Sequence, residues 1–537
     1  MKNKILLYIS LLFIVTINSC KKLNPFEGVN LVVNNEFFKS PILIELTNAN
    51  ANSIILPSNV IFKLSGPGKD LLLDDIGGKN YKIIGNALSL VLTNGSTPSE
   101  NNPVVFTLSV SAPGFLETAQ TFTIVDTEPK KFEVKLVNLT EPPKGVACKE
   151  VVVPVSGGQI TVESEKLKVA ELKLETGTIV SDASGKAIDS KNLNAEVVVF
   201  NASEPESMAA FPGGFIQENV TLSNGNEQAV NFVTAGFVAV NMEANGKEIK
   251  NFSKPLEVKV AVSPSIVNPE TGENLKEGTR IPTWSYETET GKWKQEGEAV
   301  VSKDLNGNLI ATFYASHLSY WNLDFFYRLG PKCSNYYVDI ITNSNTDTYQ
   351  SGYKGELYDS KGIFISSTFF DVRNKSKSTI INPRRTNMKM VVKDKTGKTI
   401  GSTAVFDPCA VKNVPIDITV SSPLKSVETE INFSAICQNQ SIVLKPSAWI
   451  YLLDPTGSTS QYFYMSAGKA NIKVTEDLNY IVYMYYDNKL LGGNVKFNRN
   501  GSVAIPYGSD GIEATTSFNA SKDIITYKAI YKVANCK

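Results

Sequence analysis

Short segments in which apolar and polar residues alternate recur along most of this 537-residue chain. A period of two places the apolar side chains on one face of an extended strand, whereas a helix needs a spacing of three to four. Convincing helical spacing is scarce. The pattern therefore predicts an all-β protein, and its clearest strands are ILIELT (42–47), ALSLVLT (87–93), VVFTLSVSA (104–112), KFEVKLV (131–137), LEVKVAV (256–262) and MKMVVKD (388–394).

The turns between these segments repeat one chemistry. DASG (182–185) and DSKG (359–362) pair an Asp, which accepts hydrogen bonds from its own turn backbone, with a Gly that tolerates positive φ. DLNGN (304–308) offers too few oxygens for a complete calcium loop, so we interpret these segments as plain turns. Short strands with turn signals roughly every 8–12 residues predict tandem Ig-like β-sandwich domains.

Proline-rich and polar stretches divide the chain into units. Its length favours about three to five domains. We expect a leader over 1–19, a tether over 20–30, a β-sandwich over 31–140, a larger β-rich unit over 150–328, and two further sandwiches over 329–420 and 421–537. The last two resemble diverged copies, because each runs from a cysteine through a D-x-x-G turn to a strand rich in Val, Met or Tyr.

The first 22 residues are typical of an export signal. Lys2 and Lys4 precede an apolar run, residues 5–17, that falls short of the roughly 20 residues of a transmembrane helix. Ser19 and Cys20 then resemble the cleavage site of bacterial lipoproteins, in which the cysteine thiol receives a diacylglycerol. We therefore expect a cleaved lipoprotein signal peptide, a lipidated Cys20 and attachment to the outer membrane through that lipid. The sequence leaves open whether the protein faces the periplasm or the cell surface.

Charge and histidine content exclude several functions. Lys+Arg and Asp+Glu both number 53, so no basic surface predicts nucleic-acid binding. The single histidine, His317, excludes metal sites built from several histidines, and any Ser-His-Asp triad would have to use it. We expect no metal and no cofactor. Catalysis by paired carboxylates stays open.

Five cysteines follow Cys20, and an exported protein permits disulfides. Their positions in the domain plan favour two pairs, Cys333 with Cys409 and Cys437 with Cys536, which leaves Cys148 without a partner.

The sharpest local pattern contains three of the four tryptophans, in WSYETETGKW (284–293) and HLSYWNLD (317–324). Three hypotheses compete for it. Trp284, Trp293 and Trp321 are core anchors, because large aromatic side chains dominate core burial. Alternatively, the three rings are exposed and stack on sugars. In the third hypothesis, His317 acts as an acid or base with Asp324, Glu296 or Glu298.

These motifs resemble a module of uncharacterised Bacteroidota-type outer-membrane lipoproteins and adhesin-like surface proteins, and extracellular regions of the FAM171 type. The resemblance covers about 165–328 and includes FPGGF (211–215) and TAGFVAVNM (234–242). Separately, SAPGFLETAQTFTI (111–124) resembles the carboxypeptidase-regulatory-like class of β-sandwich. The resemblance implies an extracytoplasmic β architecture with a binding or structural role, and it transfers no catalytic residue.

A second aromatic concentration, NYIVYMYYDN (479–488), places Tyr483 and Tyr485 on one strand face. Exposed tyrosines suit recognition, and this unit lies farthest from Cys20 along the chain, so we expect it to be the binding end. The sequence favours a lipid-anchored, non-enzymatic protein that binds, adheres or scaffolds, with a glycan or an envelope protein as partner. The alternatives are a glycan-binding accessory of polysaccharide uptake and, third, a glycosidase with two carboxylates roughly 5–10 Å apart.

Overall fold

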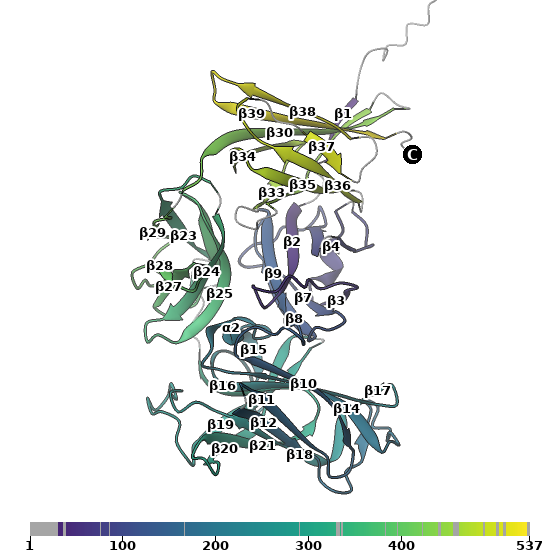
Figure 1. Cartoon of the computed structure of the whole chain (residues 1–537), viewed down its shortest axis with the longest axis vertical. Helices are drawn as coiled ribbons and strands as arrows, with labels where there is room; N and C mark the ends of the chain where they lie inside the picture. The colour runs from purple at the N-terminus through teal and green to yellow at the C-terminus, as the bar shows by residue number, and fades with distance from the viewer. Residues whose placement is uncertain are drawn as a thin grey trace, which may run out of the picture.

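The fold is almost entirely β, as predicted (Figure 1). The computed structural model describes residues 31–35, 39–75, 77–84, 86–165, 167–288, 290–328, 333–334, 337–348, 350–381, 383–394, 396–421, 423–438, 442–454, 461–486, 489–500, 504–507 and 512–533. The leader and Cys20 lie outside these residues. Among the described residues, no helix has the length and apolar character needed to cross a membrane.

Unit one is a sandwich of two sheets around a core that includes Phe106 and Leu88. Its strands alternate in burial as the sequence predicts. Ile42, Ile44 and Leu46 point into this core, while Leu43 on the other face meets a different unit. One sheet contains β4 (Leu72–Leu73), β6 (Ala87–Leu92), β2 (Lys39–Asn48) and β9 (Lys130–Leu136), with β5 (Ile83–Ile84) on β6; the other contains β3 (Ile61–Ser65), β7 (Val104–Ser111) and β8 (Thr118–Ile124); η1 spans Lys69–Leu71.

Unit two is one 13-stranded sheet rather than two separate ones. The ends of its main path, β10 and β11, lie next to each other, so the sheet folds back around a Val- and Leu-rich core. The path runs β10 (Val146–Pro154), β14 (Asn192–Phe200), β16 (Glu227–Ala244), β22 (Tyr320–Arg328), β19 (Arg280–Glu287), β20 (Lys292–Lys303), β21 (Leu309–His317), β18 (Asn251–Ala261), β12 (Leu167–Lys173), β11 (Gln159–Ser164); β13 (Val180–Ser181), β15 (Ile216–Thr221), β17 (Lys247–Glu248) and helix α2 (Pro205–Ala209) flank it.

Units three and four are again two-sheet sandwiches, each with its own core. Unit three has the sheets β26 (Lys377–Ile381), β23 (Tyr337–Ser344), β29 (Asn413–Ile418) and β25 (Phe364–Val372), β24 (Gln350–Asp359), β27 (Met388–Lys393), β28 (Thr399–Ser402). The first sheet of unit four contains β1 (Leu31–Asn35), β31 (Ile442–Pro446), β30 (Ser426–Cys437), β39 (Ile524–Val533) and β38 (Ile512–Asn519), with β34 (Lys469–Thr475) paired to β30. Its second sheet contains β33 (Gln461–Met465), β32 (Ala448–Leu453), β35 (Asn479–Tyr486), β36 (Lys489–Lys496) and β37 (Ala504–Tyr507).

Units one, three and four share one topology. In each, the first strand of the sandwich pairs in parallel with its last strand: β2 with β9, β23 with β29, and β30 with β39. Each first strand also pairs antiparallel with a middle strand, β6, β26 or β34. The similarity noticed between units three and four therefore extends to unit one, whose sequence had not revealed it.

One predicted boundary is wrong. Residues 31–35 were assigned to unit one, but β1 pairs in parallel with β31 of unit four, from Leu31 opposite Ile442 to Asn35 opposite Pro446. Unit one begins instead at Lys39. The first and the last described strands of the chain consequently share one sheet, at the top of Figure 1.

The four units form a ring rather than a string. Unit four lies at one end of the molecule and unit two at the other, with units one and three side by side between them (Figure 1). Residues of neighbouring units contact one another at each junction: Tyr286 with Ala119 (two and one), Phe215 with Phe364 (two and three), Lys473 with Asp347 (four and three) and Trp449 with Leu43 (four and one).

Candidate functional site

The three tryptophans of the sequence motif are buried, so the hypothesis that they stack on sugars is wrong. Trp284 and Trp293 have no exposed surface, and Trp321 is 2% exposed. The Trp284 ring packs edge-on against Phe232 at 4.9 Å, and its indole N–H donates to the backbone carbonyl of Asp324 at 3.1 Å. No face of these rings is left for a pyranose.

Part of this aromatic cluster joins two units. Tyr286 and Tyr320 donate their hydroxyls to the backbone carbonyls of Ala119 and Glu117 in unit one, each at 2.8 Å. Their rings share one apolar cluster with Leu116, Ala119 and Val137 of unit one and with Trp284 and Trp293 of unit two. The motif WSYETETGKW therefore seals the junction between units one and two.

The acid–base groups proposed around His317 have structural partners. His317 lies 3.5 Å from Glu296, and hydrogen bonds from His317, Lys294 and Ser285 lower the pKa of Glu296 to about 2. Glu298 pairs with Arg280 at 3.1 Å. Asp324 is fully buried, and this burial raises its pKa well above the ordinary value. An ionised Glu296 and a sealed Asp324 do not provide a general acid that a substrate can reach.

The tyrosine face of unit four is also an interface. Trp449 packs with Leu43 and Ala87 of unit one. Nearby, Tyr462 contacts the Glu45 carboxylate, and the Lys131 ammonium lies 3.6 Å from the centre of the Tyr462 ring. Tyr462 stacks on Tyr451 at 3.9 Å, and Tyr483 is half-buried 6.1 Å from Tyr451. The side chain of Tyr485 lies outside the described residues.

The last unit along the chain lies beside the first described strand. Unit four is last along the chain, but its sheet contains β1, which directly follows the tether. Unit two occupies the opposite end of the molecule from unit four (Figure 1), and the expectation that unit four is the binding end stays a prediction.

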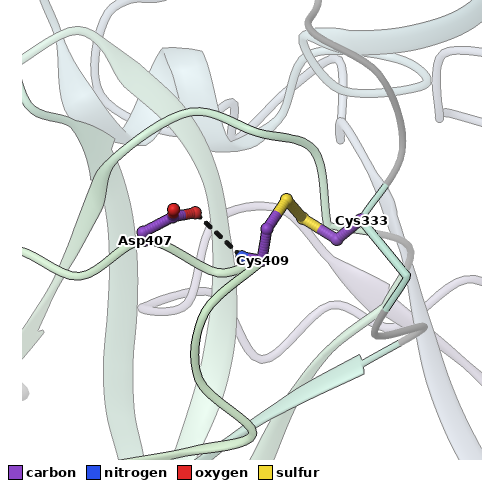
Figure 2. Close-up of a disulfide and its surroundings, with 3 residues drawn as sticks. All are labelled: Cys333, Asp407 and Cys409. Atoms are coloured by element: carbon purple, nitrogen blue, oxygen red, sulfur yellow. Dashed lines mark hydrogen bonds between the residues drawn. A yellow bond between two sulfur atoms is a disulfide. The ribbon is translucent and has the colours of Figure 1, made fainter.

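The predicted disulfide between Cys333 and Cys409 is present, with the Cα atoms 4.7 Å apart (Figure 2). It joins the segments just before β23 and β29, the two parallel strands of unit three, and the backbone N–H of Cys409 donates to Asp407 at 2.9 Å. Cys437 is disulfide-bonded, but its predicted partner Cys536 lies outside the described residues, so that pair stays a prediction. Cys148 is free, and burial raises the pKa of its thiol to about 12, which makes it unreactive.

The Asp-Gly segments are turns of the predicted kind. The Asp304 carboxylate accepts from the backbone N–H groups of Asn306 and Asn308, each at 2.8 Å, and Asp359 does the same for Lys361 and Ile363. No group of three or more His, Cys, Asp or Glu side chains suited to a metal occurs among the described residues.

A further candidate site is a cleft of about 1140 Å³ between units one, two and three, which we call the central cleft. Units one and three form its side walls, and unit two closes one end with the FPGGF loop and Tyr327. Gly213 and Gly214 of this loop have φ values of 75° and 72°, which only glycine adopts freely. The Gly213 backbone lies so close to Gln217 that an added Cβ would stand 3.3 Å from the Gln217 amide nitrogen.

Most charges in the central cleft are already paired. The walls contribute six acidic and five basic side chains: Glu45, Asp126, Glu128, Glu133, Asp339, Asp371, Lys130, Lys131, Lys135, Lys377 and Arg384. Ion pairs join Lys130 to Asp126 at 2.9 Å, Lys131 to Glu45 at 3.2 Å, and Lys377 to Asp339 at 3.1 Å. This near balance does not favour a strongly charged ligand.

Two carboxyl groups of the cleft have raised pKa values. Burial raises the pKa of Glu133, which also accepts a hydrogen bond from Thr47 at 2.5 Å. The side chain of Asp371 retains exposed surface, but loss of surrounding water between the walls raises its pKa too. Sequence reasoning missed this site, because its acids come from strands of two different units.

Buried polar groups border the cleft at unit two. Asn231 is 1% exposed, and its amide donates to the Tyr327 hydroxyl at 2.7 Å, which in turn lies 3.3 Å from Asp359. Within the described part of the chain, the amide oxygen of Asn231 and the hydroxyl of Ser367 are buried without a hydrogen-bond partner, and both residues line the cleft.

Comparison with known proteins gives a family match for one unit. Residues 184–325 match the family model described as FAM171A1/A2/B, N-terminal. The match lies inside unit two and inside the region whose motifs resemble the FAM171 type. It covers about a quarter of the chain and includes neither the leader nor the other three units.

Solved structures with some similarity are bacterial surface proteins. The C-terminal fragment of the pilus adhesin SpaC from Lactobacillus rhamnosus GG is 10% identical, with a TM-score of 0.16, over 37% of this chain and 98% of that one. The minor pilin GBS52 of Streptococcus agalactiae is 12% identical, with a TM-score of 0.14, over 38% and 98%. The major pilin BcpA of Bacillus cereus is 9% identical, with a TM-score of 0.15, over 92% and 99%. Similarity this low carries no functional argument.

Proposed function

We propose that this is a lipid-anchored envelope protein that acts by binding or scaffolding rather than by catalysis. The observation that supports this proposal is the use of the aromatic motifs. Aromatic residues suited to ligand stacking instead join units one, two and four, through Trp293, Tyr286 and Tyr320 at one junction and Trp449 and Tyr462 at the other. Such interfaces favour a rigid particle over a chain of independent domains.

The position of β1 limits how far a lipid on Cys20 could lie from unit four. Eleven peptide bonds separate Cys20 from Leu31, a reach of at most about 40 Å when fully extended. A lipid on Cys20 would therefore hold unit four close to the bilayer and present unit two away from it, with the central cleft between them.

Metabolic labelling with a palmitate analogue tests the anchor. We expect label on the wild-type protein in the membrane fraction, and neither label nor membrane retention for Cys20→Ala. Unlabelled wild-type protein, or a mature amino terminus other than Cys20, would contradict the proposed attachment.

Two measurements test the rest of the proposal. Small-angle scattering of the purified protein should fit one rigid particle with the ring arrangement, and a profile typical of flexibly linked domains would contradict a scaffold. Assays with a panel of polysaccharides and aryl glycosides should show no turnover. Turnover that disappears in Glu133→Gln or Asp371→Asn would revive the glycosidase hypothesis.

A further inference from the structure

The walls of the central cleft are strand edges rather than sheet faces. A ligand lying on a sheet face touches every second residue of a strand, because successive side chains point to opposite faces. The cleft is lined by unbroken runs instead: 120–123 of β8, 130–134 of β9, 364–367 of β25 and 377–381 of β26. Each of these strands is the last one of its sheet. Figure 1 shows β9 at the margin of unit one and β25 at the margin of unit three, on facing sides.

These edges carry unused backbone hydrogen-bonding groups. Along these four runs, the described structure shows backbone–backbone hydrogen bonds only between each strand and its single neighbour in the sheet. The outward N–H and C=O groups of an edge strand are a template for a further strand. Four such edges around one cleft are therefore a concentration of unpaired donors and acceptors.

We propose that the central cleft binds an extended polypeptide segment of low net charge, supplied by another envelope protein, which adds as a strand to one of these edges. The proposal rests on the binding role proposed above and names its partner. A peptide backbone matches the alternating donors and acceptors of an edge. The low net charge follows from the ion pairs that already neutralise the walls.

The cleft also limits which chains reach the edges. Natural proteins protect edge strands with lysines and with covering elements, because open edges cause aggregation. Here β9 carries Lys130 and Lys131, and its edge is recessed between two units. The free oxygens of Asn231 and Ser367 offer further acceptors for such a chain.

Selection of a phage-displayed library of random 12-residue peptides on the full-length protein tests the inference. Ser366 is exposed in the cleft on β25, so Ser366→Trp places a bulky ring against that strand edge, whereas Ser402→Trp places the same ring on β28 at the opposite edge of that sheet. We expect selected peptides to bind at least tenfold more weakly to Ser366→Trp and equally well to Ser402→Trp. Thr379→Trp on β26 serves as a second obstructing variant if Ser366→Trp does not fold.

Hydrogen exchange distinguishes strand addition from other binding. A bound peptide should protect amides within 120–123, 130–134, 364–367 or 377–381, and methylation of alternate peptide amides should abolish binding. The inference is overturned if no selected peptide depends on Ser366, if protection falls elsewhere, or if cell-wall oligosaccharides rather than peptides are blocked by Ser366→Trp. Intact palmitate labelling and a rigid scattering profile alongside such a failure would leave the proposed function standing.

Discussion

Unit one presents an apolar surface to unit two but a charged strand edge to unit three. Toward unit two it presents Leu116, Ala119 and Val137, and aromatic rings close the junction without leaving a cleft. Toward unit three it presents the edge of β9, which carries three lysines and one glutamate, and a cleft of about 1140 Å³ stays open. Apolar surfaces gain by excluding water, whereas charged strand edges lose hydration when they are covered. The same sandwich therefore forms a sealed junction on one side and an accessible site on the other.

The largest effect is expected from a mutation in the closed junction between units one and two. Trp293→Ala removes a ring with no exposed surface that lies 5.6 Å from Phe211 and 4.6 Å from Tyr286. We expect a loss of about 3–5 kcal/mol in the free energy of unfolding, measured by denaturant titration. Tyr314→Ala, which truncates an exposed aromatic of the same unit, should change it by less than about 0.5 kcal/mol. Equal effects would show that the Trp293 cluster does not hold the junction.

The next effect concerns the wall of the open side. The Cys333–Cys409 disulfide closes a loop of 76 residues that spans most of unit three. Replacing both cysteines by serine should cost about 2–5 kcal/mol, because the unfolded chain regains the entropy that the cross-link removed. Thermal unfolding of the wild type and of this double variant without reductant checks this, and Cys148→Ser should unfold like the wild type. Equal stability of the wild type and the double variant would contradict it.

A smaller effect is an opposite dependence of stability on pH at the aromatic junction and at the central cleft. The pKa of Glu296, beside the sealed cluster, is about 2, below the roughly 4.3 of an unfolded chain. Its carboxylate thus stabilises the fold above about pH 4.3, by about 1–2 kcal/mol after solvent screening, and this is lost as pH falls toward 2. Burial raises the pKa of Glu133 in the cleft, so its protonated form stabilises the fold at low pH and this stabilisation is lost as the pH rises.

Stability measured against pH for Glu296→Gln and Glu133→Gln checks these signs. Relative to wild type, Glu296→Gln should be less stable above about pH 4.3 and approach it in acid. Glu133→Gln should become more stable relative to wild type as the pH rises above the pKa of a glutamate in an unfolded chain. The same direction for both variants would contradict the assigned environments.

Local patterns predicted the elements of the fold well. Alternation identified β2, β6, β7, β9, β18 and β27, and Asp-Gly spacing identified turns such as the one at Asp304, because both depend on residues adjacent in the chain. The core-anchor hypothesis for Trp284 and the Cys333–Cys409 pair were also confirmed. The sugar-stacking hypothesis for Trp284, Trp293 and Trp321 was wrong, and the choice of unit four as the binding end stays a prediction.

The central cleft was out of reach of sequence reasoning. KFEVKLV is predicted as a strand from its alternation, but nothing in its local sequence indicates that β25 of another unit faces it. The same limit applies to β1, whose partner β31 lies near the other end of the chain.

The sequence by itself determined the all-β character, the burial of alternating residues and the chemistry of the turns, since these follow from side-chain periodicity and short-range hydrogen bonding. Only the tertiary structure decided which apolar faces join neighbouring units, which strand edges stay unpaired around the central cleft, and that both described ends of the chain meet in unit four. Those outcomes depend on the free energy of pairing surfaces far apart in sequence, and that free energy exists only once the units are folded and placed together.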